Sequence, residues 1–202
     1  MSRIRGRLNE GEKLFFPDTV APGGLSDSLV LRKVADEDIA GHIRFDSREG
    51  MPDLIMAVGP SRSGTTATLR LFGCVGIPSV SQPMKSILRS LQVGEDPGED
   101  FRVPGDGKLY LKETLGPYSG RESMLDPLGI MMKAAGKKFG GEGVEKLLDN
   151  THLVLLGRDP YDTWFSWRKV FSTGSLRGEK LYDNFKTSIL HADRLLERAD
   201  ML

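Results

Sequence analysis

The sequence predicts an α/β fold in which helices flank a parallel β-sheet. Strands are expected at 53–58, 108–113 and 153–156. The first and third runs are apolar without polar alternation, which is typical of strands buried in a parallel sheet. Helical patterns lie between these runs and after the last one. Strands that alternate with helices indicate parallel pairing through crossover connections.

The composition is that of an ordinary globular domain. The 202 residues suit one domain, with 39% apolar and 28% charged residues. Lys plus Arg equals Asp plus Glu, which gives no support for a general nucleic-acid-binding surface. A single cysteine, Cys74, favours a reducing compartment, and no apolar run is long enough to span a bilayer. We therefore expect a cytoplasmic protein without a membrane span.

The chain divides into a lead-in segment, 1–50, and an α/β domain, 51–202. Prolines and glycines break the lead-in early, and its apolar pairs between residues 30 and 43 are compatible with short strands or a helical turn. No strand pattern follows the last expected helix, which begins near residue 181. We expect from this that the domain is incomplete at its C-terminus.

The elements of the domain follow from local signals. A glycine loop and a helix over 64–72 come after the first strand, and an amphipathic helix is expected over 84–91. Residues 94–107, which are acidic and rich in Gly and Pro, are expected to form a loop. Helical pieces broken at Gly136 and at Gly140-Gly141 fill 121–150. Asp159-Pro160 then provides an N-cap and a first-turn proline for the next helix.

The glycine loop after the first strand is the first candidate site. Gly59 and Gly64 stand five residues apart, as in a P-loop, but Thr65 replaces the lysine of a nucleoside-triphosphate P-loop. Backbone N–H groups at a helix N-terminus and the loop hydroxyls can bind an anion without a metal ion. The candidate ligand-binding residues are Ser61, Arg62, Ser63, Gly64, Thr65 and Thr66. The alternative is a glycine turn that binds nothing.

The second candidate site follows the third strand. Arg158 lies at the carboxyl end of that strand, the edge at which open α/β sheets bind ligands. Ser166 lies about two turns into the next helix, on a face that can point back over the strand end. An arginine and a serine in these positions can share one phosphate. Taken alone, a surface ion pair for Arg158 is an equally good interpretation.

Together the two stretches resemble the sulfotransferases. The run from Ser61 to Thr66 resembles their 5′-phosphosulfate loop, and Arg158 with Ser166 resembles their 3′-phosphate motif. Many members have lysine at the position of Arg62, whereas protein-tyrosine and several bacterial members have arginine. The resemblance implies a P-loop-like sulfotransferase fold. It also implies 3′-phosphoadenosine 5′-phosphosulfate (PAPS) as donor and no metal ion.

The resemblance also implies catalytic roles. In-line transfer of a sulfuryl group needs positioning and charge stabilisation, for which Arg62 is the candidate. Cytosolic members use a histidine base after a strand, but this chain has Lys112-Glu113-Thr114 at the corresponding place. Glu113 is therefore the expected base, with Lys112 assisting at the sulfonate. A strand-end carboxylate with no catalytic role is an equally good interpretation of Glu113.

Three functions follow, in order of preference. The first is transfer of sulfuryl from PAPS to a hydroxyl or amine of a small-molecule or carbohydrate acceptor. The second is a P-loop kinase with an altered loop, which Thr65 disfavours. The third is a nucleotide-binding module without catalysis. This third function is favoured if the chain lacks the C-terminal glycine-rich basic loop of sulfotransferases.

Overall fold

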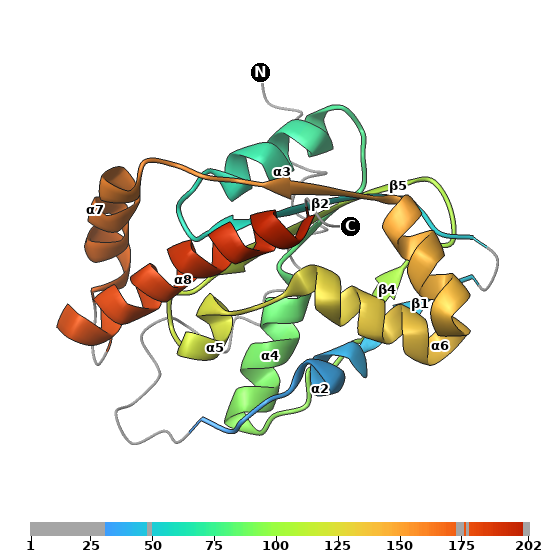
Figure 1. Ribbon diagram of the computed structural model, residues 1–202, viewed down its shortest axis with the longest axis horizontal. Helices are drawn as coiled ribbons and strands as arrows, with labels where there is room; N and C mark the ends of the chain where they lie inside the picture. The colour runs from blue at the N-terminus through green and yellow to red at the C-terminus, as the bar shows by residue number, and fades with distance from the viewer. Residues whose placement is uncertain (1–30, 48–49, 173–175, 177, 200–202) are drawn as a thin grey trace.

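The computed structural model describes residues 31–47, 50–172, 176 and 178–199, with the side chain of Ala199 excepted. Within them, helices and strands alternate along most of the chain (Figure 1). In chain order the elements are α2 (Asp36–Ala40), β1 (Ile43–Phe45), β2 (Asp53–Pro60), α3 (Thr65–Cys74), β3 (Ser79–Ser81), α4 (Pro83–Val93), β4 (Phe101–Val103), β5 (Lys108–Leu115), α5 (Gly120–Ser123), α6 (Pro127–Asp149), β6 (Thr151–Leu155), α7 (Pro160–Phe171) and α8 (Gly178–Ala199).

A four-stranded parallel sheet forms the centre of the molecule, with strand order β3-β5-β2-β6. Asp53 to Pro60 of β2 pair with Lys108 to Leu115 of β5 in continuous register. On its other side β2 pairs with β6, from Leu54 to Val58. The predicted α/β class with a parallel sheet is thus confirmed. The carboxyl ends of β2, β5 and β6 lie at one edge of the sheet.

Helices cover both faces of this sheet (Figure 1). On one face, Leu69 of α3 packs with Ala57 and Tyr110. The larger core lies on the other face and includes Leu54, Met56 and Val58 of β2 together with residues of α4, α6 and α8. Because β2 is buried from both sides, its apolar sequence has no polar alternation. Among the described residues, no helix combines the length and apolar character that a membrane crossing requires.

Several elements differ from the sequence-based expectations. Residues 101–103, expected in a loop, form β4 because they pair in parallel with β1. The helix of α6 continues through Gly136, where a break was expected, but the predicted break at Gly140 is confirmed by φ 74° and ψ −160°. Residues 36–45, assigned to the lead-in, form α2 and β1, and bury Ile39 and Phe45 in the main core. Residues 1–30, including Val30, lie outside the described part of the chain.

One glycine allows the end of β2 to approach β6 closely. A Cβ atom on Gly59 would lie 2.3 Å from the carbonyl oxygen of Leu156 and 2.8 Å from Oγ of Ser63. The first contact is with backbone, which cannot move aside without shifting the strand. Gly59 therefore sets the close packing of the strand end that leads into the glycine loop.

We predict that Gly59→Ala lowers the free energy of unfolding by about 1–3 kcal/mol, because overpacking forces the backbone to shift. The matched control is Gly157→Ala, since a Cβ at Gly157 meets nothing within 4 Å. Urea unfolding of both variants measures the difference. Equal stability of the two variants would contradict the close-packing role of Gly59.

Candidate functional site

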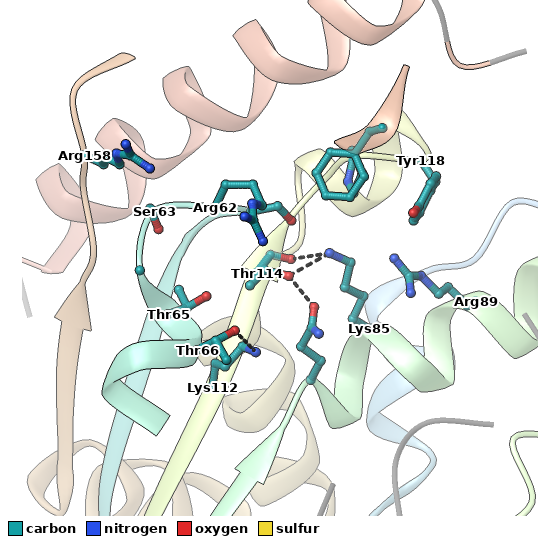
Figure 2. A pocket seen from close by; sticks show the side chains of 15 residues that line it. Arg62, Ser63, Thr65, Thr66, Lys85, Arg89, Lys112, Thr114, Tyr118 and Arg158 are labelled. Carbon is teal, nitrogen blue, oxygen red and sulfur yellow. Dashed lines mark hydrogen bonds between the residues drawn. The ribbon is translucent and has the colours of Figure 1, made fainter. Parts of the chain in front are cut away.

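A cavity of about 470 Å³ opens at the carboxyl edge of the sheet. The glycine loop, α4, the segment after β5 and Arg158 after β6 line it (Figure 2). The lining residues are Ser61, Arg62, Ser63, Gly64, Thr65, Thr66, Gln82, Lys85, Arg89, Lys112, Thr114, Pro117, Tyr118, Arg158 and Phe171. The location agrees with the general rule that open α/β sheets bind ligands beyond their carboxyl ends.

The glycine loop is shaped to present donors to this cavity. Arg62 and Gly64 have positive φ angles of 72° and 104°, and α3 begins directly afterwards at Thr65. For Arg62 the left-handed conformation costs roughly 1–2 kcal/mol, and such strain clusters at functional sites. Oγ of Ser63 is buried without a hydrogen-bond partner among the described residues. A buried, unpaired hydroxyl beside a helix N-terminus is ready to bind an anion.

The structure brings the two predicted motifs together, although they are about 100 residues apart in sequence. Nε of Arg62 donates to Oγ of Ser166 at 3.0 Å. Arg158 lines the same cavity, whereas Ser166 reaches it only through Arg62. Nη2 of Arg158 also contacts Oδ2 of Asp162 at 3.3 Å, in an exposed pair that contributes little stability. Arg158 is therefore free to exchange this weak contact for a bound anion.

Trp167 connects helix α7 to the glycine loop. Its indole Nε1 donates to the carbonyl oxygen of Ser61 at 2.5 Å, and the side chain is fully buried. Oγ of Ser61 in turn donates to the carbonyl oxygen of Gly116 at 3.1 Å. The loop is thus held between α7 and the segment that follows β5. Trp167 also belongs to a buried cluster with Leu181 and Phe185 of α8.

Lys112, the residue expected to assist at the sulfonate, lines the cavity. Its Nζ donates to Oγ1 of Thr66 and to Oγ of Ser81, both at 3.2 Å, and the residue is largely buried. Figure 2 shows the Lys112 ammonium beside Thr66 at the start of α3. The ammonium therefore adds a positive charge at the helix N-terminus, where the dipole already favours anions.

Glu113 is not among the described residues that line the cavity. Its neighbours Lys112 and Thr114 both line it, so the alternation of side chains along β5 turns Glu113 toward the opposite face. There its Oε1 accepts from the backbone N–H of Met84 at 2.7 Å, at the start of α4. Oε2 is buried without a partner among the described residues, and burial raises the pKa of Glu113 to about 7. This position places the carboxylate away from any acceptor in the cavity.

Lys85 of α4 is the main site residue that the sequence does not single out, because it lies within a segment that predicts only an amphipathic helix. It is almost fully buried and lines the cavity. Its Nζ donates to O and Oγ1 of Thr114, at 3.0 and 2.7 Å, and to the carbonyl oxygen of Gly116. Burial lowers the pKa of Lys85 to about 7, against the opposing attraction of Glu122. A lysine with such a pKa can exchange protons near neutral pH.

Arg89 and Tyr118 were missed entirely. Arg89 forms a two-point pair with Glu122, from Nε to Oε1 at 2.8 Å and from Nη2 to Oε2 at 3.1 Å. Its guanidinium carbon lies 5.0 Å from the ring centroid of Tyr118. One sequence signal was present: Lys85 and Arg89 are four residues apart on a helix, so they share a face. Nothing in the sequence shows that this face of α4 packs against the end of β5 and the segment that follows it.

The charge around the cavity is strongly positive. Five cationic side chains line it: Arg62, Lys85, Arg89, Lys112 and Arg158. None of the described lining residues is acidic. The buried carboxylate of Glu122 lies 3.6 Å from Nζ of Lys85 and 2.8 Å from Nε of Arg89. Such a cavity suits a ligand with several negative charges. The described residues that line it include no carboxylate, which is the kind of ligand that magnesium prefers.

The interpretation of the cavity depends on its own geometry and charge. Comparison of the chain with models of protein families, with curated proteins and with solved structures gave no match. The unpaired Ser63 hydroxyl, the strained loop and the five basic side chains are features that suit a polyanionic ligand.

Proposed function

We propose that this chain is a PAPS-dependent sulfotransferase with a P-loop-like fold, which transfers a sulfuryl group to an acceptor hydroxyl. The contact between Arg62 and Ser166 carries the proposal, because it joins the two predicted phosphate motifs at one cavity. The unpaired hydroxyl of Ser63 fits a sulfonate or phosphate oxygen. Five basic lining residues, with no acidic residue among the described ones, fit the charge of a bisphosphorylated donor.

Different residues would bind different parts of the donor. The N–H groups and hydroxyls of Ser63, Thr65 and Thr66, with Lys112, would hold the phosphosulfate at the start of α3. Arg158 and Ser166 would hold the 3′-phosphate and fix the register of the nucleotide. The donor supplies a sulfur atom that bonds to the acceptor oxygen as its bond to the phosphate oxygen breaks. The electron pair leaves on that phosphate, where Arg62 stabilises the developing charge.

Lys85 replaces Glu113 as the proposed base. The acceptor proton passes to Nζ of Lys85, which borders the cavity, while the Glu113 carboxylate does not. The resulting ammonium is stabilised by the three oxygen atoms of Thr114 and Gly116 around it. A base with a pKa near the working pH combines a useful neutral fraction with good proton affinity.

The binding test separates this function from the kinase alternative. We predict that adenosine 3′,5′-bisphosphate binds at least about tenfold more tightly than adenosine 5′-monophosphate, because a second phosphate engages Arg158. Arg158→Ala should remove most of that difference, whereas Lys169→Ala, on the exposed surface of α7, should leave it unchanged. Calorimetry measures each affinity. A preference for ATP with Mg²⁺, or indifference to Arg158→Ala, would favour a P-loop kinase or another nucleotide-binding module.

The pH dependence tests the base. Because Lys85 must be neutral to accept a proton, kcat/KM should rise with pH up to about 7 and level off above it. Lys85→Arg, whose guanidinium stays protonated, should lower turnover by about 100-fold or more while retaining bisphosphate binding.

Glu113→Gln provides the matched comparison for this test. It should keep the plateau rate, because Glu113 lies outside the cavity, but it should move the rise in kcat/KM to lower pH, because the Glu113 charge raises the pKa of Lys85. A collapse of turnover in Glu113→Gln together with a normal rate in Lys85→Arg would reverse the two assignments. The turnover rate of both variants is measured over pH 5–9 by stopping the reaction at fixed times and quantifying the sulfated product. Circular dichroism checks that each variant is folded.

A further inference from the structure

The cavity extends beyond the two phosphate motifs. Lys85, Arg89 and Tyr118 lie together on one side of Thr114, while Thr65, Thr66 and Arg158 lie on the other (Figure 2). Phe171 completes the lining near Tyr118, with the two ring centroids 5.8 Å apart. We call Lys85, Arg89, Tyr118 and Phe171 the second subsite. None of these residues belongs to either motif, so the subsite has its own chemistry.

Arg89 can still donate to a ligand in the second subsite. Lys85 and Arg89 share a single carboxylate, Glu122, at 3.6 and 2.8 Å. Burial raises the pKa of Glu122, but the charges of Arg89 and Lys85 outweigh it and the pKa is lowered, so Glu122 is ionised. Burial also raises the pKa of Tyr118, whose hydroxyl therefore stays neutral and adds no negative charge. Glu122 accepts from Nε and Nη2 of Arg89, so Nη1 has no hydrogen-bond partner among the described residues and can donate to an anionic group of the ligand.

Aromatic surface accompanies this charge. The rings of Tyr118 and Phe171 meet edge to face, with an interplanar angle of 75°. Both rings border the cavity and both are partly exposed, so each offers area to a ligand. Aromatic side chains pack well on the ring of a ligand, and Arg89 beside Tyr118 holds that ring in place. The subsite thus combines a flat apolar surface with a positive group.

We propose that the second subsite binds the acceptor, and that the acceptor is a small ring-bearing hydroxy compound with an anionic substituent such as a carboxylate. Tyr118 and Phe171 contact its ring, and Arg89 contacts its anionic group. Its hydroxyl then lies toward Lys85, at the junction with the glycine loop. This inference rests on the proposed function, since it names the acceptor class for the same reaction.

A binding experiment without turnover tests the inference. The protein is saturated with adenosine 3′,5′-bisphosphate and titrated with 4-hydroxyphenylacetate or with its uncharged amide. The acid should bind at least about tenfold more tightly than the amide, because only the acid offers a charge to Arg89. Tyr118→Ala should weaken both ligands by a similar factor, and Arg89→Gln should narrow the acid–amide ratio toward one. Arg102→Gln, a charge paired with Asp46 away from the cavity, is the matched control.

The outcomes separate the two proposals. Equal binding of acid and amide, preference for the amide, or no binding of either ligand would overturn the acceptor class even when the bisphosphate binds. Failure of the bisphosphate to bind would instead overturn the proposed function, and the acid–amide comparison on the free protein would still judge the subsite. Bisphosphate affinity within about threefold of wild type shows that each variant is folded. If Arg89→Gln fails to fold, the acid–amide ratio of the wild type tests the anionic group, and the weaker binding of both ligands to Tyr118→Ala tests the ring contact.

Discussion

The hydrogen bond from the buried indole of Trp167 to the carbonyl oxygen of Ser61 organises the site. It ties α7 to the glycine loop across 106 positions of sequence. Once this contact is made, Ser166 on the same helix stands at Arg62, and the cavity has a fixed wall. A buried polar group left unpaired costs about 1–3 kcal/mol, so the indole and the carbonyl oxygen hold each other in place. The geometry of the loop therefore depends on a helix that follows the last strand.

Electrostatics explains why such a cavity needs a charged ligand. Five basic side chains line the cavity, Arg62, Lys85, Arg89, Lys112 and Arg158, and none of its described lining residues is acidic. Cations gathered in one cleft repel each other and raise the local potential. A bound polyanion would relieve that repulsion, so the arrangement of the cations would be more stable with the ligand bound than without it. The same field would stabilise negative charge that develops on a departing phosphate.

The sequence was enough to predict the class of fold and the position of the loop, since these depend on local patterns such as the apolar run of β2. It could not decide which strand-end side chain enters the cavity. Lys112 and Glu113 are neighbours on a strand and so point to opposite faces, which already excludes a shared role in one cavity. The pairing of β5 with β2 and the position of α3 decide that Lys112 is the one inside. Arg89 and Tyr118 meet only through tertiary packing, which no local pattern records.

A crystal structure with adenosine 3′,5′-bisphosphate tests most directly whether the two motifs form one nucleotide site. We predict the 5′-phosphate at the backbone N–H groups of Ser63 to Thr66. We also predict the 3′-phosphate within hydrogen-bond distance of Arg158 and Ser166. A bisphosphate bound in the reverse direction, or outside this cavity, would contradict this prediction.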